Sequence, residues 1–133
     1  MSIDIRWKQR FENLEKAFCL LQEVIENNQI DKLSSLEKEG LVQRFIFVLE
    51  LTWKTLKDKM QHDGLVIDKI SPKYVFKLAY QKHYITDINI WLEMIADRNS
   101  MSHNYNEANF ENLLKSLHIK YYPKLKYFVE NIK

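Results

Sequence analysis

Residues 45–49 read Phe-Ile-Phe-Val-Leu, and they lie inside a longer segment, residues 34–64, that has the pattern of one long helix. Ser34 and Glu37 have the three-residue spacing of a capping box, in which each side chain bonds the other residue's backbone N–H. Gly64 is a natural stop at the other end. Five consecutive apolar residues cover every side of a helix, so neighbouring helices or a partner chain should enclose them. We therefore expect segment 34–64 to be the centre of a helical bundle.

The preceding segment, residues 4–27, is predicted to be an amphipathic helix. Its large apolar residues recur in alternating steps of four and three, which is the stripe of a helix in a bundle. They are Trp7, Phe11, Leu14, Phe18, Leu21 and Ile25. The polar residues 27–29 should end this helix.

Three shorter helices are predicted after the long one. Each begins with a residue type that caps helix N-termini: Ser71, Thr86 and Asn106. The first should end near His83, and Pro123 should kink or restart the last. Their inner faces are Val75, Phe76 and Ala79, then Ile88, Trp91, Leu92 and Ile95, then Phe110, Leu113, Leu114 and Leu117. The apolar link 65–67 has no evident strand partner.

Length and composition fit one all-helical domain covering residues 1–133. The chain has 133 residues with 46% hydrophobic content, but only 2 Gly and 2 Pro, which leaves little turn chemistry for sheets. The net charge of +2 is too mild to indicate nucleic-acid binding by itself, and it does not forbid it.

Cys19 is the only cysteine, so no internal disulfide is possible and a reducing compartment is expected. We predict that Cys19 packs in the core. No apolar run approaches the roughly 18 residues that a membrane span needs. A cytoplasmic protein without a membrane partner is the expectation.

The segment 97–105, Asp-Arg-Asn-Ser-Met-Ser-His-Asn-Tyr, gathers an arginine, a histidine and a tyrosine at the predicted end of the fourth helix. Asn99 and His103 fall on one face, whereas the step from Arg98 to His103 turns about 140° on an ideal helix. Arg98 and His103 therefore converge only if the helix loosens at its end or if a second copy supplies the facing group. This spacing points to a helix end and to a dimer.

These side chains offer the means to cleave RNA without a metal. A histidine can take the proton from a ribose 2′-hydroxyl or protonate the leaving oxygen, and arginine can pair bidentately with the phosphate. Asn99, Ser100 and Ser102 would add hydrogen bonds. The spacing alone is also what a structural role would produce, because cations at a helix C-terminus favour the helix dipole.

Other polar residues give weaker signals. The three remaining histidines, His62, His83 and His118, have no Cys, Asp or Glu at metal-ligand spacing, so surface positions and no metal site are expected. Glu50 with Lys54, and Lys54 with Asp58, have the spacing of helical ion pairs, and Glu50 is also a candidate partner for Arg98. The three tryptophans, Trp7, Trp53 and Trp91, are read as core anchors. No phosphate-binding glycine loop and no Gly-Ser with paired aspartates occurs, so the chain should not itself transfer nucleotides.

Residues 38–58, Ser71-Pro72 and residues 97–105 together resemble, in order, the nucleotidyltransferase substrate-binding proteins of the HEPN superfamily. The resemblance covers nearly the whole chain and is far more specific than the Arg-x4-His spacing. It implies an all-α, up-and-down four-helix bundle with an additional short helix, which dimerises and is encoded beside a minimal nucleotidyltransferase.

The resemblance also implies roles for the motif. Related pairs act as toxin and antitoxin, and the toxin is a metal-independent endoribonuclease in which the residues matching Arg98 and His103 meet across a homodimer. The tyrosine matching Tyr105 is the one that the partner modifies with adenylate to silence the toxin. Asn99 matches a polar position of the motif, Ser102 is a further supporting residue, and no cofactor is expected.

Two alternatives remain open at this point. In one, the bundle is a non-catalytic subunit that holds a substrate or nucleotide for the separate nucleotidyltransferase, with Arg98 on a phosphate. In the other, it is a dimerisation module in which Arg98 and His103 only tie helix ends together.

Overall fold

The fold is described by a computed structural model that covers residues 3–103 and 106–132. Helices joined by short connections make up this part of the chain, and no strand occurs in it. In chain order the elements are α1 (Ile3–Asn27), the 3-10 turn η1 (Ile30–Lys32), α2 (Ser35–His62), α3 (Pro72–Gln81), α4 (Asn89–His103), α5 (Glu107–Ser116), the π-helical turn η2 (Leu117–Tyr121) and α6 (Tyr122–Asn131). The prediction of an all-α chain is confirmed.

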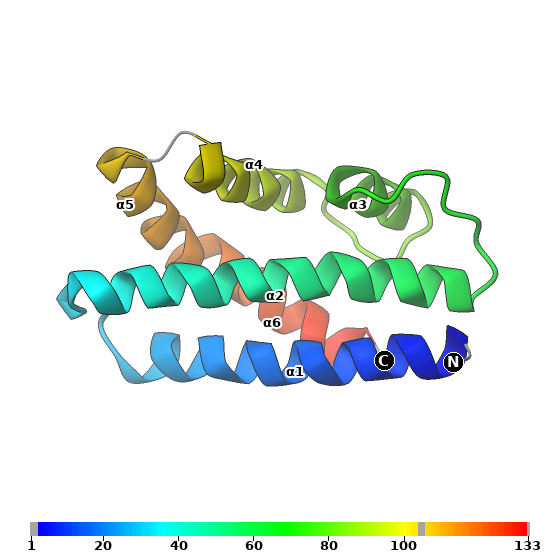
Figure 1. Cartoon of the computed structure of the whole chain (residues 1–133), viewed down its shortest axis with the longest axis horizontal. Helices are drawn as coiled ribbons and strands as arrows, with labels where there is room; N and C mark the ends of the chain where they lie inside the picture. Colours follow the sequence, from blue (N-terminus) through cyan, green and yellow to red (C-terminus); the bar gives the residue numbers. More distant parts are fainter. Residues whose placement is uncertain (1–2, 104–105, 133) are drawn as a thin grey trace.

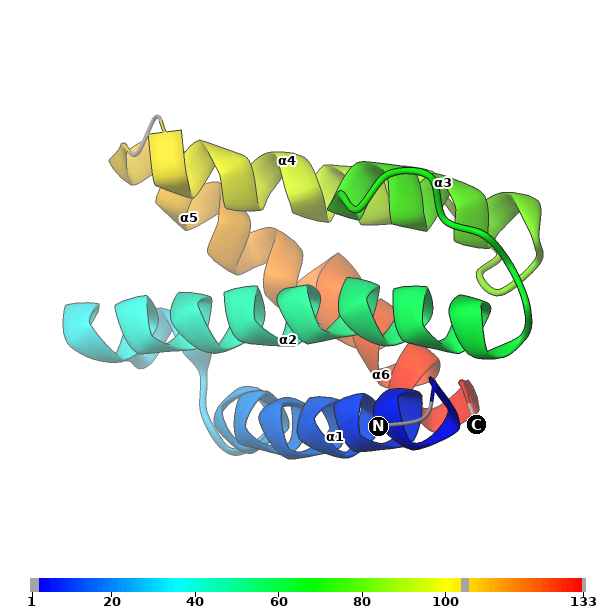
Figure 2. The ribbon, with the colours of Figure 1, turned by 45° about the vertical axis from the view of Figure 1, so that its right-hand side comes forward.

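Four long stretches run up and down, and the short helix α3 is added to them. Figure 1 shows α1 and α2 side by side and antiparallel, with α3 and α4 along the opposite side of α2. The elements α5, η2 and α6 follow one another without a break and cross behind α2, which Figure 2 shows from another side. This is the four-helix bundle with an additional short helix that the resemblance implied.

The core follows the predicted apolar stripes. Every member of the α1 stripe is buried, from Trp7 to Ile25. On α2, Phe45, Val48 and Leu49 are buried, but 59% of Phe47 is exposed. The neighbouring helices therefore enclose most of the apolar run at 45–49 and leave one aromatic side chain open on the surface of the single chain.

Trp91 joins three helices at one point in the core. Its indole stacks on Phe76 of α3 with ring centroids 5.0 Å apart, and it meets Phe128 of α6 edge to face at 5.7 Å. Trp7 and Trp53 are buried as well. All three tryptophans are core anchors, as predicted, and Trp91 fixes the start of α4 against the bundle.

The helix starts follow most of the predicted caps. Three of them are confirmed by side chains that accept a backbone N–H: Ser34, Ser71 and Asn106. The prediction of Thr86 as a cap is wrong, because α4 begins at Asn89 and the Asp87 carboxylate accepts the Asn89 N–H at 3.1 Å. Aspartate is the better acceptor at a helix start, since its charge also favours the helix dipole.

Pro123 lies in the first turn of α6, directly after the π-helical turn η2. Proline has no N–H to donate, and its ring crowds the carbonyl four residues earlier, here that of Ile119. Regular α-helical bonding cannot pass through this point, and a local π turn is one of the known responses. The predicted kink or restart is confirmed in this form.

Cys19 is exposed, so the prediction that it packs in the core is wrong. The buried stripe of α1 runs through Phe18 and Leu21, and the position after Phe18 turns by about 100° away from that stripe. The thiol is free.

Candidate functional site

The motif segment forms the C-terminal half of α4. The first half of the helix is anchored by Trp91, Met94 and Ile95, which are all buried. From Asp97 onward no described residue of α4 is buried. The fold thus fixes one end of the helix in the core and presents its other end at the surface.

Arg98 lies partly exposed where α4 faces α2, with 32% of its side chain accessible. Its Nη2 is 3.2 Å from Glu50 Oε2, and its Nη1 donates to the amide oxygen of Asn99 at 3.2 Å. The proposed contact between Glu50 and Arg98 is therefore present. Asn99 itself is exposed, beside the guanidinium group that it contacts.

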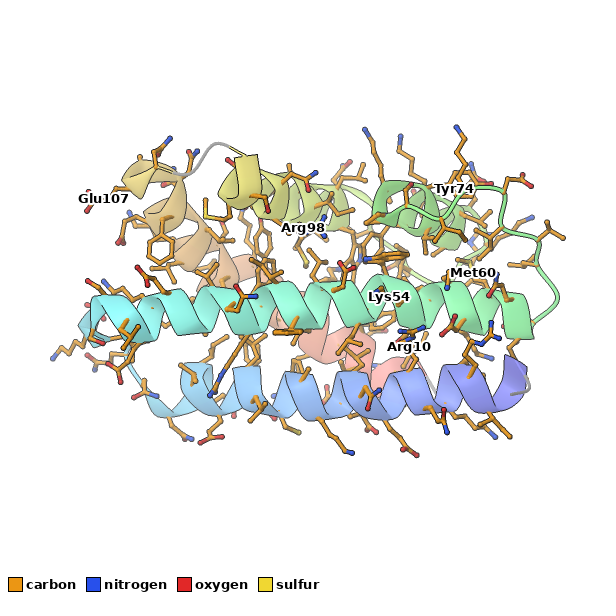
Figure 3. All side chains as sticks on the ribbon, in the orientation of Figure 1. Arg10, Lys54, Met60, Tyr74, Arg98 and Glu107 are labelled. Atoms are coloured by element: carbon orange, nitrogen blue, oxygen red, sulfur yellow. The ribbon has the colours of Figure 1, made fainter. Side chains whose placement is uncertain are left out.

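Glu50 also binds two neighbours on its own helix. The Trp53 indole Nε1 donates to Oε2 at 3.1 Å, and Lys54 Nζ lies 3.4 Å from Oε1. The predicted pair of Glu50 and Lys54 is confirmed. Figure 3 labels Arg98 on α4 and Lys54 on α2, the two helices that the Glu50 carboxylate joins.

Asp58 differs from its prediction as a partner of Lys54. It is fully buried, and its Oδ2 accepts from Arg10 Nε of α1 at 3.0 Å, while Lys57 Nζ lies 3.4 Å from Oδ1. Arg10, labelled in Figure 3, lies between α1 and α2. A cation from another helix replaces the expected i,i+4 partner because Asp58 faces α1.

The serines of the motif have structural contacts. The Ser102 hydroxyl donates to the carbonyl of Arg98 at 3.4 Å, and Asn109 Nδ2 of α5 donates to the Ser100 hydroxyl at 3.1 Å. Asn109 follows the cap Asn106, so the start of α5 is tied to the end of α4. Ser102 is exposed and remains accessible to a ligand.

A buried polar group that no sequence motif indicated packs against α4 from the bundle interior. The hydroxyl of Tyr121, a fully buried residue of η2, bonds the carboxylates of Asp97 and of Glu93, the latter at 3.0 Å. Burial first, then the bond to Asp97, raises the pKa of Tyr121 above its ordinary value. Lys120 at 2.7 Å is the main cause that lowers the pKa of Glu93. In the sequence, the one-turn spacing of Glu93 and Asp97 was the only indication of this group. No local pattern indicated that Tyr121 would bond them.

His103 is the last residue of α4, and the helix is regular up to that point. Its side chain lies outside the described part of the chain, and so does Tyr105. Along a regular helix, positions 98 and 103 are about 140° apart around the axis. Loosening of α4 before its end therefore does not bring the two positions together.

The other histidines lie away from this segment. His62, His83 and His118 are exposed, as predicted. Among the described residues no group of three or more His, Cys, Asp or Glu is placed to hold a metal ion. In the same residues no helix is long and apolar enough to cross a membrane.

A cavity of about 430 Å³ lies at the opposite end of α4 from the motif. Its lining includes Trp91, Phe128 and Tyr84, together with Lys59 and Lys124. Asp63 is in the same wall and binds the Tyr84 hydroxyl at 2.5 Å. The cavity does not include Arg98, so the motif and the cavity are separate features.

These observations define the class of protein: an all-α bundle that holds Arg98 at the surface-facing end of an anchored helix. The family model of proteins described as nucleotidyltransferase substrate binding protein like matches residues 9–133. The chain belongs to this family, and the resemblance found in the sequence is confirmed.

Two known proteins are similar to this chain. A protein of Haemophilus influenzae named "Probable ribonuclease HepT" is 29% identical over 105 residues, which cover 71% of this chain and 72% of that protein. A solved crystal structure of a Thermus thermophilus protein superposes with a TM-score of 0.77 at 27% identity, covering 90% of this chain and 98% of that one.

Proposed function

We propose that this chain is a homodimeric, metal-independent endoribonuclease whose site is formed by Arg98 and His103. The observation that carries the proposal is the position of Arg98, which is held at the exposed end of an anchored helix within reach of solvent. The name of the Haemophilus influenzae relative supports RNA as the substrate class.

The geometry of α4 supports a homodimer. Because α4 is helical up to position 103, positions 98 and 103 are about 140° apart around its axis, and in the proposed dimer a second copy supplies the facing group. The exposed Phe47 on α2 also supports an interface with a second copy, since a large aromatic side chain gains by burial.

The roles follow from ordinary acid–base chemistry. His103 takes the proton from the 2′-hydroxyl or gives one to the leaving 5′-oxygen, and Arg98 binds the phosphate as negative charge develops on it. Asn99 and Ser102, both exposed beside Arg98, supply further hydrogen bonds. These groups need no metal or cofactor for the reaction.

The family description supports a separate minimal nucleotidyltransferase chain as the partner. In the proposed pair, this chain is the toxin and the nucleotidyltransferase is the antitoxin, which adenylylates Tyr105. Charge and bulk two residues from His103 would block RNA by occlusion and repulsion. The proposed place of action is the cytoplasm, where RNA and nucleoside triphosphates are both available.

The test is incubation of the purified dimer with total RNA in excess EDTA, after intact mass has shown Tyr105 to be unmodified. The wild type should cut, and His103→Ala and Arg98→Ala should not. His118→Ala is the matched control, because His118 is an exposed histidine on η2 outside the motif. Equal cleavage by His103→Ala and the wild type would refute the proposal.

A second candidate is favoured by the description of the family as substrate binding. In it the bundle forms one wall of the nucleotidyltransferase site, and Arg98 binds a substrate phosphate. Tight association with the partner, combined with no cleavage by either the free or the bound dimer, would select this function.

A further inference from the structure

The Glu50 carboxylate holds two cations from two helices at one point of the surface. Its Oε2 lies 3.2 Å from Arg98 Nη2, and its Oε1 lies 3.4 Å from Lys54 Nζ. All three side chains are about one-third exposed: 32% for Arg98, 31% for Glu50 and 35% for Lys54. One carboxylate against two cations leaves a net positive charge that solvent and ligands can reach.

We propose that Lys54 is a second phosphate-binding residue of the site and that Glu50 is the positioning residue that sets Arg98 and Lys54 side by side. The inference rests on the proposed function, because it takes single-stranded RNA as the ligand. It adds a residue from α2 to a site otherwise built from α4.

The carboxylate of Glu50 is itself fixed in place. The indole of Trp53, a residue that is only 7% exposed, donates to Oε2 at 3.1 Å, and this bond holds the oxygen that Arg98 contacts. Arg98 is thereby held through Nη2, and its Nη1 donates to the neutral, exposed amide of Asn99. A phosphate oxygen can replace that amide without breaking the ion pair.

Lys54 binds Glu50 more weakly than Arg98 does. Its distance of 3.4 Å describes a partly exposed i,i+4 pair, and pairs of this kind contribute little to stability. An incoming phosphate can therefore take the ammonium group at little cost. Two adjacent cations on one carboxylate match successive phosphates of a strand better than one cation does.

The test measures binding of a short single-stranded 2′-O-methyl RNA by fluorescence anisotropy at several salt concentrations. This probe has no free 2′-hydroxyl and is not cleaved, so binding is read apart from catalysis. Each lost phosphate contact should lower the slope of log Kd against log salt by about 0.7. We expect that decrease for Lys54→Met and for Arg98→Met.

Lys59→Met is the matched control. Lys59 forms the same kind of pair on the same helix, with Asp63 four residues on at 3.0 Å, but it contacts neither Glu50 nor Arg98. Its slope should equal that of the wild type. A wild-type slope for Lys54→Met, or no binding of the probe by the wild type, overturns the inference.

Glu50→Gln tests the positioning role. Removing the negative charge should lower the KM for RNA several-fold, and loss of the fixed guanidinium should lower kcat as well, with partial rescue of kcat by Glu50→Asp. A change in thermal stability alone, with KM and kcat unmoved, would contradict the role. If the probe binds as expected but no RNA is cut, the ribonuclease proposal fails while the phosphate site stands.

Discussion

Arg98 is held by a partner that is 48 positions away in the sequence. The motif indicated the arginine, and the apolar surroundings of Glu50 suggested it as one possible partner, but no local pattern joins the two. Arg10 and Asp58 are separated by the same 48 positions and pair in the same way. Contacts of this kind depend on how helices pack, which a single sequence does not state.

Arg98→Lys should lower kcat about 10²-fold and leave stability nearly unchanged. Lysine keeps the charge but has one ammonium group, so it cannot hold Glu50 and a phosphate on separate nitrogens of one planar group. The ion pair with Glu50 is one-third exposed, so its loss costs less than about 1 kcal/mol. Initial rates and thermal unfolding of the same preparation check both parts. Full activity in the lysine variant would argue against this role of the guanidinium group.

Arg10→Met should destabilise the fold more than any change at Arg98. It leaves the fully buried Asp58 with Lys57 as its remaining cationic neighbour. Breaking such a pair typically costs about 3–5 kcal/mol, and we expect about 2 kcal/mol because 30% of Arg10 is exposed. Urea unfolding measures the difference. An unchanged midpoint would mean that solvent or Lys57 satisfies Asp58.

At the scale of the helices, the ends of α2 and α3 have the same geometry but different residues. Gly64 and His83 both have positive φ, 93° and 67°, and each donates to a carbonyl in the last turn of its helix. The backbone N–H of the next residue donates to the carbonyl five residues earlier, from Leu65 to Met60 and from Tyr84 to Ala79. Both ends are therefore Schellman motifs.

The stop at Gly64 was predictable because glycine adopts this conformation without a Cβ clash. The stop near His83 was predicted only from where the apolar pattern ends. A histidine tolerates positive φ at a cost, and no sequence rule demands it there. The caps Ser34, Ser71 and Asn106 were predictable for the same reason as Gly64, since the residue type itself makes the bond.

His83→Gly should stabilise the protein by about 0.5–1 kcal/mol, which raises the melting temperature by a few degrees. Gly64→Ala should do the opposite, by about 1 kcal/mol or more, since alanine is strained at a φ of 93°. Differential scanning calorimetry compares the two. A lower melting temperature for His83→Gly would show that the histidine side chain compensates for the strain.

At the scale of the whole molecule, the order of the helices and their buried faces followed from apolar periodicity. The meaning of the motif did not follow from its spacing, because positions 98 and 103 are about 140° apart around a regular helix. The resemblance of the motif segments to a family supplied that meaning. The buried Tyr121 beneath Asp97 and Glu93 was not predictable from either source.

Stability should depend on pH in both directions. Hydrogen bonds from Tyr122, Ser34, Tyr84 and Lys120 lower the pKa values of Glu26, Glu37, Asp63 and Glu93, respectively. A carboxyl group whose pKa is lowered by folding stabilises the fold at pH values above its ordinary pKa of about 4. This stabilisation is lost as the pH falls through the pKa of the folded state. Burial, followed by a carboxylate partner, raises the pKa of Tyr84 and Tyr122 to about 12.

The tyrosines act with the opposite sign. Their contribution is complete below the ordinary pKa of about 10 and is lost as the pH rises through 12. Melting temperature should therefore be flat between about pH 5 and 10 and fall on both sides. Tyr84→Phe should reduce the decrease in melting temperature at acid pH, because Asp63 loses the hydrogen bond that lowers its pKa. The same decrease in melting temperature at acid pH in that variant would contradict this role of the bond between Tyr84 and Asp63.

The most direct test of the ribonuclease account is the chemistry of the cut ends. A synthetic RNA is incubated with the unmodified protein in excess EDTA, and the fragments are identified by mass spectrometry. Attack by the 2′-hydroxyl with His103 as acid or base leaves a 2′,3′-cyclic phosphate and a 5′-hydroxyl, and the account predicts these ends for the wild type and no fragments for His103→Ala. Fragments with 5′-phosphate ends, cleavage by His103→Ala, or intact RNA in the wild-type reaction would contradict it.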